Sequence, residues 1–118
     1  MRRAGLAAVV LLLVMAMTSV AEATHGGVTA TTTGGKAVWY SSPNYMYVYD
    51  TRADGYSVYA EYCWGTSCSS GTRLYNRSGN GTVKRFTLYP ASSDITFRVC
   101  RERPFQSDDC GSWTTADA

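Results

Sequence analysis

Hydrophobic and polar residues alternate along most of the chain from residue 36 onward. Short runs rich in Tyr, Val, Phe, Trp and Thr are separated by Gly, Asn, Asp, Ser and Pro, which is typical of β-strands joined by turns. The pattern predicts seven strands, over residues 37–41, 45–50, 56–64, 72–76, 82–89, 94–102 and 109–115. Short antiparallel strands at this spacing predict an all-β fold, a seven-stranded antiparallel β-sandwich made of two sheets.

The alternation also predicts which side of each strand faces the core. Ile95, Phe97 and Val99 alternate with more polar residues, so these three are expected to point inward. The same reasoning places Cys63 and Cys100 on outward positions, and one face of each strand is expected to be solvated. The inward positions predicted in this way are Met46, Val48, Val58, Ala60, Tyr62, Trp64, Lys84, Phe86, Leu88, Ile95, Phe97 and Val99.

The N-terminus has the three parts of an export signal. Arg2 and Arg3 form a basic region, Leu6–Met17 is an unbroken apolar run, and Ala21–Ala23 has the small-x-small pattern that signal peptidase cuts. The sequence therefore predicts a signal peptide over residues 1–23 and a secreted, extracellular protein. The alternative is an uncleaved anchor, but the wider apolar stretch from Ala4 to Ala21, 18 residues long, is near the lower limit for a membrane span and no basic stop-transfer residue follows it.

Two further stretches follow the signal. Residues 24–35 are mostly Gly, Thr and Ala and cannot bury much apolar surface, so they are predicted to form a flexible N-terminal tail. Residues 36–118 are predicted to form one β-sandwich domain. Removing Arg2, Arg3 and Glu22 from a chain with 11 basic and 9 acidic residues leaves a net charge of +1. A nearly neutral domain has no general reason to bind nucleic acid or, once the signal is cleaved, a membrane.

Four cysteines allow three disulfide patterns. The pairs Cys63–Cys68 and Cys100–Cys110 are favoured, because each pair brackets a short loop and export favours oxidation. The rival is an inter-sheet bridge between Cys63 and Cys100, which requires both side chains to face inward. A zinc site is disfavoured because the spacing lacks C-x-x-C pairs.

The segment from Asp50 to Glu61 has the spacing of a calcium loop. Counting Asp50 as position 1, Asp54 is at position 5, Gly55 at position 6 and Glu61 at position 12. Position 3 is Arg52, a cation where a ligand oxygen belongs, and the flanks are strands rather than helices. A hairpin turn in which Gly55 supplies a positive φ explains the same residues, so no metal site is predicted.

Tyrosine is the residue that departs most from average use. Tyr45, Tyr47 and Tyr49 share one face of a predicted strand, and with Tyr59 on the next strand they would form an aromatic strip. Such a strip can stack on sugar rings or anchor a protein partner. The alternative is that tyrosine is there because it favours strands and pairs well across them.

The loop over residues 101–109 is a second candidate for binding. The Cys100–Cys110 bridge would frame it, Phe105 would lie at its tip, and Arg101 and Arg103 would flank it. Loops on rigid scaffolds often carry function. The alternative is that these charges merely pair across strands.

Catalysis finds little support in the sequence. The single histidine, His25, lies in the predicted tail, and the cysteines are expected in disulfides, so no Ser-His or Cys-His pair is expected in the fold. No carboxylate pair stands out as an acid–base couple. The sequence predicts neither an enzyme nor a cofactor.

Two resemblances add to this interpretation. Phe86–Pro90 followed by Ile95–Val99 resembles the E–F corner of fibronectin type III-like sandwiches, where a Leu-x-Pro turn precedes a Tyr-x-Phe-x-Val strand; Ile95 stands in place of the corner tyrosine. This resemblance implies an immunoglobulin-like or fibronectin III-like topology.

The chain also resembles the small secreted β-proteins that are abundant in actinomycetes, a group with no assigned activity. The similar pieces are the Ala-rich signal, the segment Tyr49–Gly55, and the two segments Phe97–Cys100 and Cys110–Trp113. The resemblance implies an extracellular location and a β fold, and it assigns no functional residue.

The function predicted from the sequence is a secreted, non-catalytic binding module whose partner is an extracellular glycan or protein, with a polysaccharide or cell-envelope ligand held by aromatic residues. One alternative is a secreted inhibitor or effector that acts through the 101–109 loop. Another is a structural envelope protein, which would self-associate.

Overall fold

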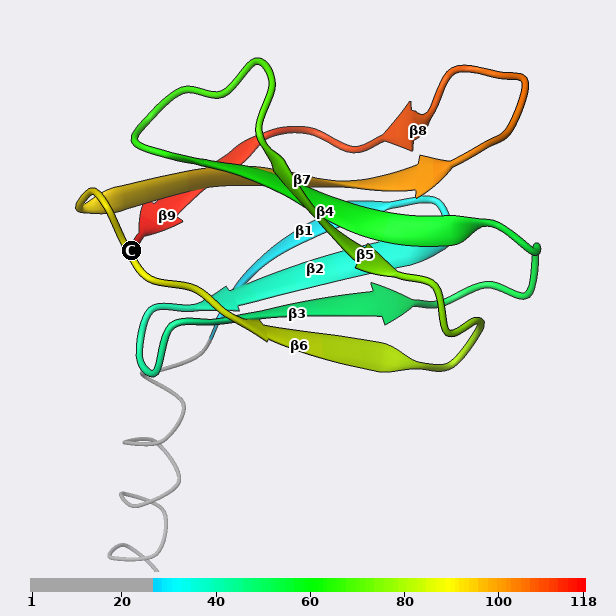
Figure 1. Cartoon of the computed structure of the whole chain (residues 1–118), viewed down its shortest axis with the longest axis horizontal. Coiled ribbons are helices and arrows are strands. Elements are labelled where there is room, and N and C mark those ends of the chain that lie inside the picture. Colours follow the sequence, from blue (N-terminus) through cyan, green and yellow to red (C-terminus); the bar gives the residue numbers. More distant parts are fainter. Residues whose placement is uncertain (1–26) are drawn as a thin grey trace, which may run out of the picture.

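The computed structural model describes residues 27–118, which form two antiparallel sheets packed face to face (Figure 1). The first sheet has the order β1 (Val28–Thr32), β2 (Gly35–Tyr40), β3 (Tyr45–Asp50) and β6 (Val83–Thr87). The second has the order β5 (Thr72–Asn76), β4 (Ser57–Trp64), β7 (Asp94–Glu102) and β8 (Asp109–Cys110), and β9 (Thr114–Asp117) also pairs with β7. This architecture confirms the predicted all-β sandwich. Within residues 27–118 no helix is long and apolar enough to cross a membrane.

The predicted strands match the observed ones closely, except at the two ends of the domain. The last predicted strand, 109–115, is split into β8 and β9 because the chain leaves the ladder around Gly111. A Cβ atom on Gly111 would come within 1.9 Å of the Thr31 carbonyl oxygen, so only glycine lets this segment approach β1.

The predicted flexible tail over residues 24–35 is wrong for its described part. Residues 28–32 form β1, an edge strand that pairs with β2 and places Ala30 opposite Ala37 in the core. An edge strand of small residues is held mainly by its backbone ladder, and here the Thr32 hydroxyl also donates to the Asp109 carbonyl at 3.0 Å. The rest of the tail, residues 24–26, and the predicted signal peptide over 1–23 lie outside the described residues.

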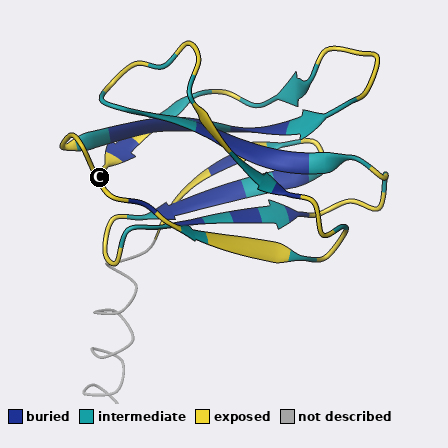
Figure 2. Ribbon diagram, in the orientation of Figure 1, coloured by how far each residue is buried: buried dark blue, intermediate teal, exposed yellow. Residues whose placement is uncertain are grey.

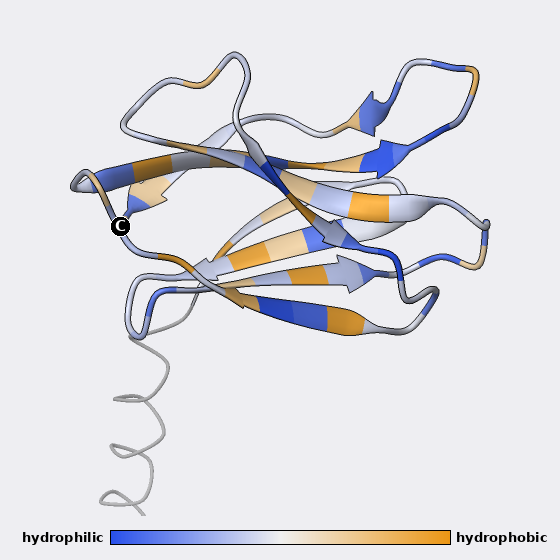
Figure 3. Ribbon diagram, viewed as in Figure 1, coloured by the Kyte–Doolittle hydropathy of each residue, from blue (hydrophilic) through white to orange (hydrophobic). Residues whose placement is uncertain are grey.

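The core lies between the two sheets. Trp39, Met46 and Phe97 are among its largest side chains, and the Trp39 indole N–H donates to the Asp117 carbonyl at 2.8 Å. The predicted inward positions are confirmed at Met46, Val48, Val58, Ala60, Leu88, Ile95, Phe97 and Val99, while Tyr62, Trp64 and Phe86 are partly buried against them. Lys84 shares their face but lies exposed on the edge strand β6. Along β3 in Figure 3, apolar residues alternate with more polar ones, as the sequence pattern requires.

Both disulfides pair as predicted, Cys63 with Cys68 and Cys100 with Cys110. Cys63 lies opposite Thr96 and Cys100 lies opposite Tyr59, so both cysteines face away from the core on the outer side of the second sheet. Each disulfide therefore closes a short excursion of the chain on that side, and neither links the two sheets.

The outer faces of the two sheets differ in burial, and the expectation that both are solvated is wrong for the second sheet. Tyr59, Glu61, Thr96 and Cys100 point outward from β4 and β7 and yet are buried. In Figure 2 the dark colour of buried residues runs along β4 and β7, whereas β6 is largely exposed. Both charged and aromatic neighbours lie against these residues: Arg98 pairs with Glu61, and Arg73 and Tyr75 contact Tyr59.

Candidate functional site

The outer face of the first sheet carries a row of tyrosines. Tyr45, Tyr47 and Tyr49 project from the same side of β3, with ring centroids 6.1 Å apart for Tyr45–Tyr47 and 6.4 Å apart for Tyr47–Tyr49. Tyr40 of β2 joins them, with its ring 5.5 Å from that of Tyr47. All four side chains are partly exposed. The prediction that the three β3 tyrosines share one solvent-facing side is thus confirmed.

Two cations complete this face. The Lys36 ammonium lies 4.4 Å from the ring centroid of Tyr49, and the Arg85 guanidinium lies 4.5 Å from that of Tyr45. Lys36 pairs in register with Tyr49, and Arg85 pairs with Tyr47, so the cations come from the strands on either side of β3. We call the set Lys36, Tyr40, Tyr45, Tyr47, Tyr49 and Arg85 the tyrosine face. The strands that build it place no carboxylate on that side of the sheet.

The ring orientations give the tyrosine face its shape. Tyr47 and Tyr49 lie nearly parallel, at 28° to each other. Tyr40 and Tyr45 meet Tyr47 edge to face, at 82° and 80°. Edge-to-face contacts are a favoured aromatic geometry, so Tyr40 and Tyr45 hold the ring of Tyr47 in place. The result is a row of partly exposed aromatic rings on the outer side of the first sheet.

Tyr59 does not belong to this row, and its predicted place in the strip is wrong. It lies on the outer side of the second sheet, 1 % exposed, with the Arg73 guanidinium 4.6 Å from its ring centroid. Its hydroxyl donates to Asp108 Oδ2 at 2.6 Å. Burial, together with the hydrogen bond to the Asp108 carboxylate, raises the pKa of Tyr59 well above its ordinary value. Tyr59 is therefore a structural residue.

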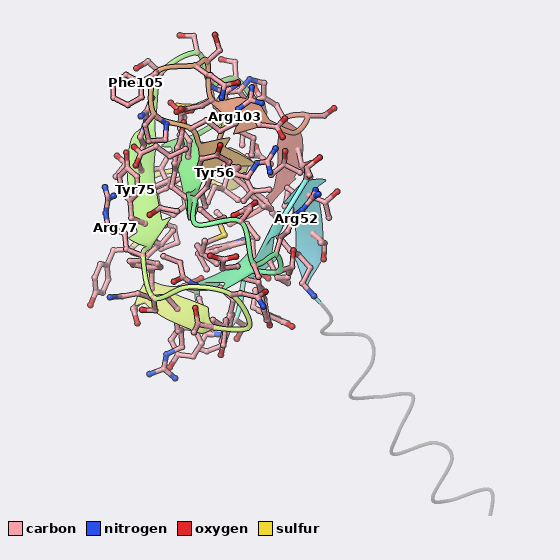
Figure 4. All side chains as sticks on the ribbon, turned by 90° about the vertical axis from the view of Figure 1, so that its right-hand side faces the viewer. Arg52, Tyr56, Tyr75, Arg77, Arg103 and Phe105 are labelled. Atoms are coloured by element: carbon pink, nitrogen blue, oxygen red, sulfur yellow. A yellow bond between two sulfur atoms is a disulfide. The ribbon has the colours of Figure 1, made fainter. Side chains whose placement is uncertain are left out.

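The β7–β8 loop, residues 103–108, projects from one end of the sandwich. Phe105 at its tip is fully exposed, and its backbone has a φ of 65°, in the left-handed region that non-glycine residues seldom adopt (Figure 4). The Arg103 guanidinium donates through Nε and Nη2 to the Ser107 carbonyl, at 3.0 and 2.8 Å. Asp108 accepts hydrogen bonds from the Arg103 amide and from the Tyr59 hydroxyl. The loop is thus ordered by its own polar contacts, and Phe105 takes no part in them.

Arg101 is not available to a ligand, contrary to the prediction that it flanks a binding tip. Its side chain is 12 % exposed, and its guanidinium lies 2.9 Å from both Asp54 Oδ2 and Asp109 Oδ2. Hydrogen bonding to Asp54 raises the pKa of Arg101 despite burial. Burial alone would raise the pKa of Asp54, but hydrogen bonds from the Tyr56 amide and from Arg101 outweigh it and lower that pKa. Arg101 therefore fixes the β3–β4 loop to the strand that follows the β7–β8 loop.

The same end of the sandwich holds a cleft of about 340 Å³ between the β3–β4 and β5–β6 connections. Arg52, Tyr56 and Arg77 line it, and Figure 4 shows these three at the end that also carries Phe105. Asp50 also lines the cleft, and its carboxylate accepts a hydrogen bond from the Arg52 amide at 3.3 Å. The cleft is a mixed-charge surface between turns, with Gly55 at φ 74° as the hairpin interpretation predicted.

The carboxylates of the calcium-loop pattern do not converge. Asp54 pairs with Arg101, whereas Glu61 pairs with Arg98 at 2.9 Å on the outer side of the second sheet. Among residues 27–118 no three His, Cys, Asp or Glu side chains are grouped closely enough to hold a metal ion. His25 lies outside the described residues.

Comparisons of the chain with protein-family models, with curated proteins and with solved structures find no match. The tyrosine face and the β7–β8 loop therefore have to be interpreted from their own residues and geometry.

Proposed function

We propose that this protein is an exported, non-catalytic binding module that holds a polysaccharide chain against its tyrosine face. The observation that carries the proposal is the row of partly exposed tyrosines along β3, supported by Tyr40 and free of carboxylates. A tyrosine ring offers an apolar surface and a wet hydroxyl, which together suit a sugar ring with its apolar face and polar edge. A row along one strand suits an extended polymer better than a small molecule.

Export and topology belong to the same proposal. Two disulfides support a protein that matures in an oxidising compartment. We infer an immunoglobulin-like arrangement from the strand order, because β2-β3-β6 and β4-β7-β9 correspond to the A-B-E and C-F-G orders of that fold. In this correspondence β5 is an extra strand beside β4, and β1 is an extra edge strand beside β2.

The test is affinity electrophoresis of the mature protein through gels that contain single soluble polysaccharides, both neutral and acidic. Retardation by at least one of them, lost in Tyr47→Ala, is the expected result. Tyr75→Ala is the matched control, because Tyr75 also carries a stacked arginine, Arg77 at 4.0 Å, but lies on the second sheet. Migration unaffected by every polysaccharide contradicts the proposal, as does equal loss of retardation in both variants.

A second candidate function, a secreted inhibitor or effector, is favoured by Phe105. A fully exposed aromatic residue on an ordered loop is the kind of anchor that dominates protein interfaces, since little conformational entropy is lost on binding. Its left-handed backbone differs from the extended strand of peptides that add to a sheet edge, so insertion of the side chain alone is expected.

Inhibition of chymotrypsin and of α-amylase, both present as purified enzymes, tests this second candidate. Inhibition that is lost in Phe105→Ala and kept in the neighbouring control Gln106→Ala supports it. Full activity of both enzymes at high concentrations of the protein counts against it.

A further inference from the structure

The cations of the tyrosine face have no carboxylate partner among residues 27–118. Of the other described cations, Arg73, Arg77, Arg98 and Arg101 each lie within 4.0 Å of a described carboxylate, whereas Arg52, Lys84 and Arg103 do not. Lys36 and Arg85 contact tyrosine rings instead, and no described acidic residue lies within ion-pair distance of either charge. These charges are therefore available to a ligand.

The positions of the two cations match the direction of the tyrosine row. Lys36 approaches Tyr49 from β2, and Arg85 approaches Tyr45 from β6. A polymer that runs along β3 would pass between them and meet one cation near each end of the row. A guanidinium stacked on a ring still directs its N–H donors sideways, in the geometry that receives a carboxylate through two hydrogen bonds.

We propose that the ligand of the tyrosine face is a polyuronate, a polysaccharide in which each sugar ring carries a carboxylate. This inference rests on the proposed function and specifies its ligand class. The ring faces of the sugar pack on Tyr47 and Tyr49, while carboxylates of the same chain pair with Arg85 and Lys36. A polyol phosphate polymer would satisfy the cations only, because it offers no sugar ring to the tyrosines.

Isothermal titration with polygalacturonate and with its fully methyl-esterified form tests the inference, since the two polymers share a backbone and differ in charge. We expect the ester to bind at least about tenfold more weakly, because a charge-assisted hydrogen bond is stronger than a neutral one. Arg85→Gln and Lys36→Gln should each weaken polygalacturonate binding about tenfold and leave ester binding unchanged. Arg77→Gln is the matched control, because it removes the same charge from outside the tyrosine face, just after β5, where Arg77 pairs with Glu102.

Each other outcome overturns the inference in a recognisable way. Equal binding of acid and ester removes the role of the cations but leaves the proposed polysaccharide function standing. An equal effect of Arg77→Gln and Arg85→Gln shows that net charge alone matters. Binding of poly(glycerol phosphate) as tight as that of polygalacturonate, and unaffected by Tyr47→Ala, shows that sugar stacking is not used. If neither polygalacturonate nor its ester binds but another polysaccharide retards the protein in the gel, only this inference is overturned. If no polysaccharide binds at all, the proposed function is overturned as well.

Discussion

The two sheets use similar residues on their outer faces for different purposes. On the first sheet, the tyrosine face leaves its rings partly exposed and its two cations without described carboxylates. On the second, Tyr59 bonds to Asp108 and contacts Arg73, Glu61 pairs with Arg98, and Cys100 is bonded to Cys110. We call Tyr59, Glu61, Arg73, Arg98 and Cys100 the ion-pair face. The same kinds of side chain thus stabilise the fold where they are paired with each other, and remain open to a ligand where they are not.

The ion-pair face depends most on Glu61. Its side chain is 3 % exposed, and it accepts hydrogen bonds from both Arg98 and the Gly71 amide. Glu61→Ala would leave these donors unpaired, so we expect the free energy of unfolding to fall by about 3 kcal/mol, as for other broken buried ion pairs. Denaturant titration measures this loss. A change below about 1 kcal/mol would mean that the ion-pair face is not a structural network.

The second-largest loss of stability is expected for the disulfide on the same face. Replacing both Cys100 and Cys110 by Ala should lower the free energy of unfolding by about 2.7 kcal/mol in the chain-entropy account, because their sequence separation is 10 residues. Replacing Cys63 and Cys68, separated by 5 residues, should cost about 2 kcal/mol. Polysaccharide binding should survive both double replacements at temperatures where the protein stays folded. Its loss from the folded variants would show that the two faces are not independent.

Tyr59 should give the ion-pair face a characteristic pH dependence. Its folded pKa is raised above the ordinary value of 10.0, so its stabilising contribution is complete below pH 10 and is lost as the pH rises beyond it. Tyr59→Phe should therefore be less stable than the parent by about 1 kcal/mol at neutral pH. This difference should shrink above pH 10. Denaturant titrations at pH 7 and pH 11 measure it, and a constant difference contradicts the assignment.

The tyrosine face should show the smallest effect on stability. Arg85→Gln should change the free energy of unfolding by no more than about 0.5 kcal/mol, because Arg85 is exposed and its contact with Tyr45 is made at the surface. Thermal melts of Arg85→Gln and Glu61→Ala, measured side by side, compare the two effects on stability. A loss that approaches the one for Glu61→Ala would make the tyrosine face a second structural network.

Part of the difference between the two outer faces could be predicted from the two-residue alternation along the strands. Alternation places Tyr45, Tyr47 and Tyr49 on one face because side chains on a strand repeat every two residues. It cannot say which strands are neighbours, so the predicted place of Tyr59 beside the β3 tyrosines is wrong, because β4 belongs to the second sheet. Tyr40 was missed because its place beside the row depends on the β2–β3 register, which is a long-range property.

The sequence pattern also does not predict which distant residues pair with each other. The burial of Glu61 follows from its position opposite Arg98 in the β4–β7 ladder, 37 residues away in sequence. The sequence predicts a flexible tail where β1 lies, because its mostly small residues give no hydrophobic signal, although its backbone can still extend the sheet. The loop disulfides were predictable because both cysteines of each pair bracket a short segment and Cys63 and Cys100 face outward.

Chemical-shift mapping with ¹⁵N-labelled protein and polygalacturonate tests the division between the two faces most directly. We predict that the amides of β2, β3 and β6 around Lys36, Tyr47 and Arg85 shift as polymer is added, while those of β4, β7 and the β7–β8 loop stay in place. Shifts that cluster on β4 and β7, or at Phe105, would contradict the account.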